Sequence, residues 1–214
     1  MSIQTEITRL NGIKTTLQSD KNDIATAITA KGVTTDGHGF DDFANDISGI
    51  DLYAFWRLFI TDNMTIVTEE MLSGLTSIHD YAFYTKPSLK SVTIPNSITS
   101  IGSNSFVGCS GLTTFNVPDS VTSLGASTFR SCTGLTSIHI GIGVTEIGVA
   151  AFNNCTSLTS FTITASSPPQ LDSTNAFTNT NNCPIYVPAN SVNSYKNATN
   201  WSTYASRIQA IPST

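Results

Sequence analysis

The sequence predicts a repeat protein of mixed α and β structure. A solenoid of short parallel strands follows an N-terminal helical module and ends in a helical C-terminal cap. Three observations support this fold class: phenylalanine recurs every 23 residues in mid-chain, apolar residues follow a heptad near the N-terminus, and aromatic residues keep helix-compatible spacings near the C-terminus. We expect a helical attachment or oligomerisation module (1–50), an aromatic-rich joint and N-terminal cap (51–71), the solenoid (72–177), and a capping strand and helix (178–214).

The 23-residue period organises nearly all apolar residues of the middle segment. One column holds Phe83, Phe106, Phe129 and Phe152, and another holds Leu89, Leu112, Leu135 and Leu158. A unit this short cannot bury its own apolar face, so each coil must pack against the next and build one continuous core. Such folds usually bind rather than catalyse.

Each unit contains the alternation of a short strand, with Phe115 and Val117 pointing inward and Asn116 outward. Strands of successive units should pair in parallel. Pro118 ends the strand, because proline cannot donate to a ladder. We expect the glycines that recur after the second apolar pair to occupy turns that need positive φ. These glycines are Gly102, Gly125 and Gly148.

The repeat pattern F-x-x-C-x-x-L-x-x-h-x-h-P-x-S, where h is apolar, resembles the BspA-type leucine-rich repeats of bacterial surface proteins and of proteins from bacteria-infecting viruses. The resemblance covers roughly Leu72 to Phe177. Downstream, Ile185-Tyr186-Val187-Pro188 is expected to form the last core strand. The segment 190–208 is expected to form a helical cap similar to the endings of many BspA-type arrays. Its apolar residues are Val192, Tyr195, Trp201, Tyr204 and Ile208.

The first 50 residues predict a separate helical module. A heptad runs from residue 3 to residue 28, with Lys14 and Lys21 also in its seam. The apolar seam residues are Ile3, Ile7, Leu10, Leu17, Ile24 and Ile28. The seam supports either self-association or packing on the subunit's own core, and it does not fix a number of chains. A second short helix is expected to place Phe40, Phe43, Ile47 and Ile50 on one face.

These two helices together resemble N-terminal attachment segments of structural proteins, such as fibre and receptor-binding proteins, from tailed bacteriophages. The resemblance implies attachment to other virion proteins, and it favours a homotrimer because phage fibres are usually trimeric. The N-terminus lacks the features of a secretory signal and the C-terminus shows no anchor, which favours a virion protein over an exported adhesin.

The composition argues against nucleic-acid partners and membrane insertion. Charged residues form 12% of the chain and the net charge is −5, whereas a nucleic-acid partner would require a basic stripe. No run of about 18 apolar residues could span a bilayer.

The cysteines and histidines do not form a recognisable catalytic or metal pattern. Cys109, Cys132 and Cys155 share one column and are expected to be buried thiols, since zinc would need paired ligands at shorter spacing. The sequence has no P-loop, dinucleotide fingerprint or nucleophile elbow. We therefore expect no enzyme activity, no cofactor and no metal site.

The predicted function is that of a bacteriophage virion structural protein, of fibre or decoration type. It would display the repeats at the virion surface to bind a host-surface glycan or protein. The alternative is a bacterial surface adhesin or a secreted BspA-type binding protein. The candidate ligand-binding row is Thr93, Asn116, His139 and Thr162. Its side chains suit hydrogen bonding to sugars or peptides, although they would serve equally well on a spacer.

Overall fold

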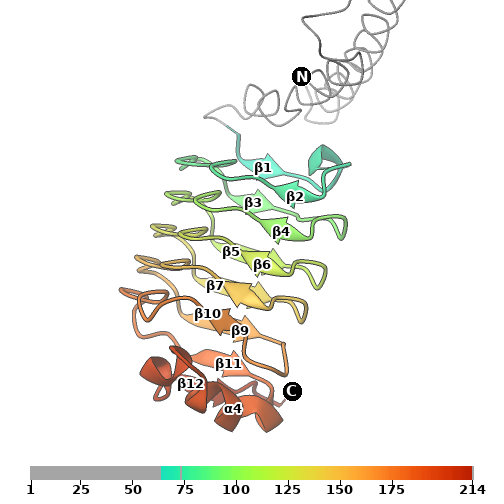
Figure 1. Ribbon diagram of the computed structural model, residues 1–214. Helices are drawn as coiled ribbons and strands as arrows, with labels where there is room; N and C mark the ends of the chain where they lie inside the picture. Colours follow the sequence, from blue (N-terminus) through green and yellow to red (C-terminus); the bar gives the residue numbers. More distant parts are fainter. Residues whose placement is uncertain (1–63, 73, 214) are drawn as a thin grey trace, which may run out of the picture. The chain divides into compact units, whose positions relative to one another are not determined.

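A computed structural model describes residues 64–72 and 74–213, which belong to one compact unit of the chain. Within these residues the chain winds into a solenoid whose successive coils are stacked on one another (Figure 1). The predicted heptad, the second short helix and the first part of the aromatic joint lie outside the described residues.

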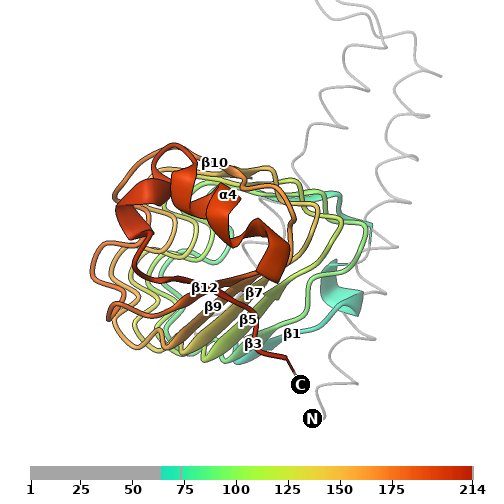
Figure 2. The same ribbon diagram turned by 90° about the horizontal axis from the view of Figure 1, so that it is seen from below.

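Parallel strands form the walls of the solenoid. A five-stranded sheet has the order β12-β11-β9-β7-β5, and a second five-stranded sheet has the order β10-β8-β6-β4-β2. The first sheet contains β5 (Thr114–Val117), β7 (Ser137–Ile140), β9 (Ser160–Ile163), β11 (Ile185–Val187) and β12 (Ile208–Ala210). The second contains β2 (Ser77–Ile78), β4 (Ser100–Ile101), β6 (Ser123–Leu124), β8 (Glu146–Ile147) and β10 (Gln170–Leu171). The two sheets lie on opposite sides of the solenoid (Figure 2).

The first described coil begins with a short strand. β1 (Ile66–Val67) pairs in parallel with β3 (Ser91–Val92), and the 3-10 helix η1 (Glu70–Leu72) follows it. Strand pairing therefore starts upstream of residue 72.

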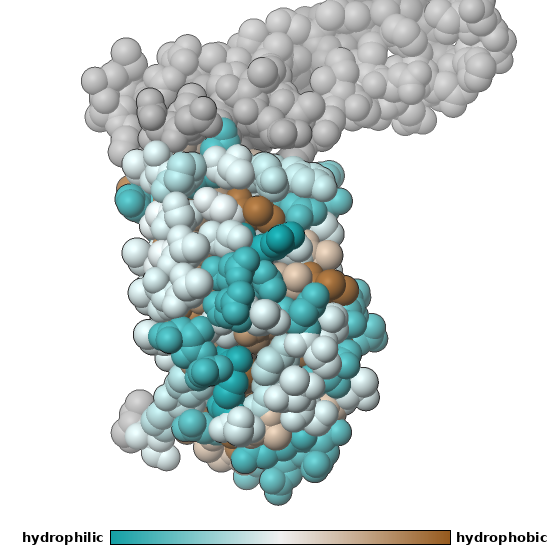
Figure 3. Space-filling view, turned by 90° about the vertical axis from the view of Figure 1, so that its left-hand side faces the viewer, coloured by the Kyte–Doolittle hydropathy of each residue, from teal (hydrophilic) through white to brown (hydrophobic). Residues whose placement is uncertain are grey.

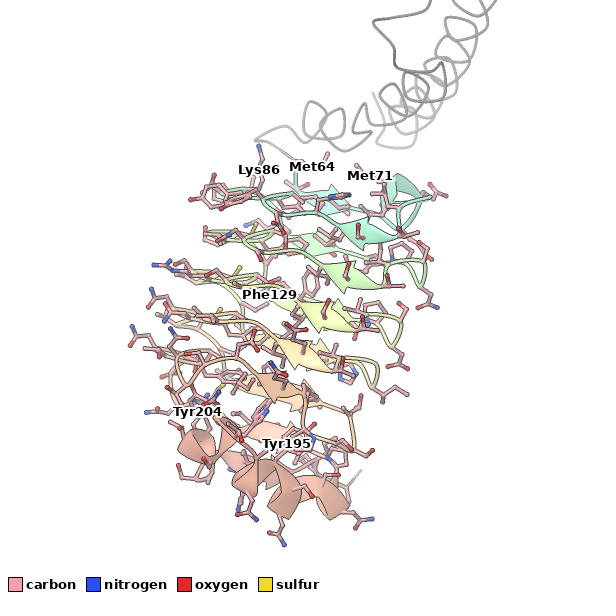
Figure 4. The ribbon with its side chains drawn as sticks, in the orientation of Figure 1. Met64, Met71, Lys86, Phe129, Tyr195 and Tyr204 are labelled. Carbon is pink, nitrogen blue, oxygen red and sulfur yellow. The ribbon has the colours of Figure 1, made fainter. Side chains whose placement is uncertain are left out.

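The predicted inward columns form the core. Phe83, Phe106, Phe129 and Phe152 stack as nearly parallel rings, with centroid separations of 4.9, 5.3 and 5.7 Å between successive rings. Figure 4 shows Phe129 in the middle part of the solenoid. Such offset stacking adds to the apolar burial of each ring, and the leucine column is likewise fully buried. Each coil thus covers the aromatic face of the coil before it.

The cysteine column lies beside the phenylalanine stack. The thiol of Cys109 donates to the carbonyl oxygen of Phe83 over 3.0 Å, and the next two cysteines repeat this contact one coil further on each time. All three are free and buried, so the predicted thiol state agrees with the structure.

The recurring glycines are required for a reason that differs from the prediction. None of Gly102, Gly125 and Gly148 has positive φ. A Cβ atom built on Gly125 would lie only 2.4 Å from the backbone nitrogen of Ser103 in the preceding coil. These glycines therefore permit close approach of neighbouring backbones. The left-handed conformation falls two residues later, at Asn104, Ser127 and Ala150.

The C-terminal segment also differs from its prediction. It contains η2 (Ala189–Ser191), the six-residue helix α4 (Val192–Asn197) and η3 (Trp201–Tyr204), which together cover one end of the stack (Figures 1 and 2). Ile208 is not helical but opens β12, which pairs with β11, so β11 is not the last strand. Asn200 interrupts the helical spacing because it adopts a left-handed conformation with φ 63°.

Aromatic side chains of the C-terminal segment form hydrogen bonds to the irregular last coil, at residues 165–174. Tyr195 donates through its hydroxyl to the carbonyl oxygen of Ala165 over 2.8 Å, and the Trp201 ring nitrogen donates to that of Pro169 over 2.8 Å. The Tyr204 hydroxyl donates to the Thr174 carbonyl oxygen. Figure 4 shows both tyrosines at this end of the chain. These hydrogen bonds supply donors to backbone carbonyl groups of the last coil, which no further regular coil follows.

Candidate ligand-binding face

The predicted row lies along the outer surface of the first sheet. Asn116 on β5 is paired in register with His139 on β7, and His139 with Thr162 on β9. Each side chain points outward, because the residues on either side of it are buried. Neighbouring strands are about 4.8 Å apart, so the three polar groups follow one another at that interval.

Thr93 is the exception in the predicted row. It is exposed and follows the end of β3, which pairs with β1 in a separate two-stranded sheet. In the described strand pairing, Thr93 has no register partner in the row.

The row continues beyond the residues predicted for it. Tyr186 on β11 is paired with Thr162 on one side and with Gln209 on β12 on the other. A signal for this extension was present, because Tyr186 and Gln209 are 23 residues apart. The helix-compatible aromatic spacing in the same segment concealed it.

A second row of hydroxyl groups lies on the same face. Thr114, Ser137 and Ser160 are mutually paired and also point outward, two residues before the first row. We call the two rows together the polar face. It comprises Thr114, Ser137, Ser160, Asn116, His139, Thr162, Tyr186 and Gln209.

Two threonine columns of the solenoid use their hydroxyl groups internally. Thr136 donates to the carbonyl oxygen of Thr113 over 2.9 Å, and Thr159 donates to that of Thr136 over 3.0 Å. Thr122 and Thr145 make the same inter-coil bond on the opposite sheet, each over 3.1 Å. The hydroxyl groups of these threonines therefore link successive coils by hydrogen bonds.

The side chains of the polar face, by contrast, make no hydrogen bond to any residue that the structure describes. The face also carries no carboxylate, ammonium or guanidinium group. It therefore presents donors and acceptors that are available to a ligand on a sheet held rigid by parallel pairing.

The buried thiols are poorly suited to nucleophilic chemistry. Burial raises the pKa of Cys109 and of Cys155 to about 12, and burial likewise raises the pKa of Cys132. All three are protonated at neutral pH, whereas the thiolate is the reactive form. Within residues 64–72 and 74–213, no three side chains of histidine, cysteine, aspartate or glutamate gather as a metal-binding group.

The side of the solenoid seen in Figure 3 is mostly hydrophilic or near neutral in hydropathy, with separate hydrophobic residues. Large apolar side chains do reach solvent, at Ile66, Tyr81, Tyr84, Ile142 and Val149. No helix among the described residues has the length and apolar character needed to cross a membrane.

Comparison with known proteins identifies the repeats. The model of the BspA-type leucine-rich repeat region matches residues 48–184 in six copies. The chain belongs to the BspA-type leucine-rich repeat family. The predicted repeat type is thereby confirmed. No curated protein matches the sequence significantly.

A solved structure shares the leucine-rich repeat fold. The T. pallidum leucine-rich repeat protein TpLRR is 25% identical with a TM-score of 0.52, and the match covers 59% of this chain and 60% of that one. This chain thus spans less than two thirds of TpLRR. A leucine-rich repeat protein from Bacteroides ovatus (19% identity, TM-score 0.28, 71% and 52% covered) also matches. A leucine-rich cell surface protein from Faecalibacterium prausnitzii matches with 22% identity and a TM-score of 0.27, over 60% of this chain and 56% of that one. None of these comparisons supports the predicted phage attachment segment.

Within this BspA-type array, the inward and outward columns differ in how much they vary. The leucine column is identical in four successive repeats, whereas the outward position holds threonine, asparagine, histidine and threonine. Packing explains the constancy of the buried column. The outward column makes no side-chain hydrogen bond to the residues that the structure describes, so no such bond restricts its chemistry.

Proposed function

We propose that this BspA-type protein is a non-enzymatic binding protein displayed on a bacterial surface, and that it attaches to its target through the polar face. One observation carries the proposal: side chains on the polar face make no hydrogen bonds to the described residues, whereas neighbouring threonine columns do. The family resemblance to bacterial surface proteins supports the location.

The geometry favours weak contacts repeated along the sheet. Each strand contributes one or two uncharged polar groups at equivalent, register-paired positions. A ligand that spans several coils meets these groups in succession, and its affinity then depends on how many are engaged together.

Attachment of the purified full-length protein to candidate host or neighbouring cells tests this proposal. The double variant Asn116→Ala/His139→Ala should reduce attachment while its thermal unfolding stays unchanged. A matched control, Asn96→Ala/His79→Ala, removes the same side-chain types from exposed positions off the polar face. Equal attachment by wild type and the polar-face variant would contradict the proposal.

A second candidate function, a virion structural protein, rests on the N-terminal heptad. In this function the seam of Ile3, Leu10 and Leu17 associates the chain into a homotrimer and joins it to other virion proteins, with the repeats at the virion surface. Antibody labelling distinguishes the locations, since it should mark phage particles in this case and bacterial cell surfaces in the first.

Light scattering tests self-association under either function. The full chain should form oligomers at tens of micromolar, whereas a truncated chain starting at Asp51 should be monomeric. Monomers in both samples would refute the oligomer.

A further inference from the structure

Tyr186 gives the polar face an aromatic subsite at its C-terminal end. Its neighbours along β11, Ile185 and Val187, are both fully buried, so the Tyr186 side chain points outward and is partly exposed. The register places it between Thr162 and Gln209.

The hydroxyl group of Tyr186 differs from those of the other tyrosines near this end of the chain. Tyr195 and Tyr204 both donate to carbonyl oxygens of the irregular last coil. The Tyr186 hydroxyl makes no such bond to any described residue. Its ring therefore presents an apolar surface with an available polar tip, the combination enriched where proteins bind ligands.

Two ring side chains frame the C-terminal half of the face. His139 and Tyr186 stand on strands that are two apart, about 10 Å, with the hydroxyl of Thr162 between them. Gln209 adds an amide one strand beyond Tyr186, and Ser137 and Ser160 line the same stretch. An extended ligand would meet rings and hydrogen-bonding groups in alternation.

The chemistry of this surface favours one class of ligand. Anionic polymers would require lysine or arginine, and the polar face has neither. An extended peptide that adds to a sheet binds at a strand edge through its backbone, whereas these groups project from the sheet surface. A neutral sugar chain has hydroxyl groups for the amides and hydroxyls and apolar C–H faces for the rings. Its residues repeat along an extended chain at nearly the strand interval.

We propose that the polar face binds an extended neutral polysaccharide, with Tyr186 stacking on one sugar ring and Thr162 and Gln209 hydrogen-bonding its neighbours. This inference rests on the proposed binding function and names its ligand class.

Titration of the full-length protein with soluble neutral polysaccharides tests the ligand class. Dextran, soluble starch, yeast mannan and cello-oligosaccharides serve as neutral probes, and polygalacturonate serves as the acidic one. At least one neutral probe should bind, and polygalacturonate should not. Binding to polygalacturonate alone, or to none of these probes by a protein that does attach to cells, would overturn the proposal.

Variants of Tyr186 test the subsite with whichever neutral probe binds. Tyr186→Ala should weaken binding by ~10-fold or more, and Tyr186→Phe, which removes only the hydroxyl, by ~2- to 10-fold. Tyr84→Ala is the matched control, because it removes a 42% exposed tyrosine from a turn off the polar face, and it should leave affinity unchanged. If Tyr186→Ala impairs folding, Tyr186→Phe and Gln209→Ala still decide the question.

The outcomes separate this inference from the proposed function. Cell attachment that survives Tyr186→Ala and excess neutral polysaccharide, but is lost in Asn116→Ala/His139→Ala or after protease treatment of the cells, leaves the binding function standing and refutes the glycan subsite. Absence of attachment by wild type to any candidate cell refutes both.

Discussion

Truncation of Leu135 should destabilise the solenoid strongly, and the structure sets the size of the effect. The side chain is fully buried, and Leu112 and Leu158 occupy the equivalent positions in the coils before and after it. Inter-coil strand pairing and the phenylalanine stack prevent these coils from closing on the space left behind. Leu135→Ala should therefore cost about 3–5 kcal/mol of unfolding free energy, the upper part of the range for buried leucine truncation.

Thr136→Ala is the neighbouring comparison. Thr136 is exposed, but its hydroxyl donates to the carbonyl oxygen of Thr113. That carbonyl oxygen also accepts hydrogen bonds from the backbone N–H groups of Thr136 over 2.8 Å and of Ser137 over 3.3 Å, so it keeps both partners in the variant. The loss should be about 0.5–1 kcal/mol, and Thr136→Ser, which keeps the donor, should lose less.

Urea unfolding of the full chain, followed by circular dichroism, measures all three variants. Repeat proteins can unfold in more than one step, so midpoints and slopes should be compared across variants and with a second probe such as tryptophan fluorescence. Equal losses for Leu135→Ala and Thr136→Ala would show that the inward and outward assignments are wrong.

Four further predictions concern a close backbone approach, the buried thiols and Arg207. Gly125→Ala should cost about 1–3 kcal/mol in urea unfolding because its Cβ meets backbone, and no loss would refute that close approach. The three core thiols should resist iodoacetamide until the chain is unfolded. Unfolding free energy should fall as pH rises above 9.0, the ordinary thiol pKa, because the unfolded chain ionises there and the folded thiols do not; a flat profile would contradict this. Arg207→Lys should lower the thermal midpoint, because lysine cannot reproduce the bonds of the guanidinium to the Cys183 carbonyl oxygen and the Thr180 hydroxyl.

The period of the sequence was sufficient to predict the core, because identical repeats impose identical packing. Phe106 and Leu112 occupy the positions expected from their columns, and Asn116 points outward as the alternation around it predicted. Periodicity, however, reports which residues are equivalent and not why they recur. The recurring glycines were assigned to turns because positive φ is their commonest reason, whereas inter-coil distance, which is not visible in one repeat, is the actual cause.

The C-terminal end was harder to predict because two patterns overlap there. Trp201 and Tyr204 have the spacing of a helix, and Tyr186 and Gln209 have the spacing of the repeat. The structure satisfies both patterns in turn, with short helical segments followed by a strand that rejoins the sheet. The aromatic end of the polar face was missed for this reason.

The two kinds of polar column give the solenoid a way to vary recognition without disturbing its fold. A substitution at Thr136 removes an inter-coil hydrogen bond, whereas a substitution at His139 removes no bond within the described residues. Stability therefore constrains the first column and leaves the second free, provided that the new side chain suits a strand surface. In the proposed binding mode, each coil contributes its own residue to the polar face, so changes on separate strands would alter separate points along the ligand. The order of Asn116, His139, Thr162 and Tyr186 can then specify the order of groups on a bound chain while the core beneath them stays the same.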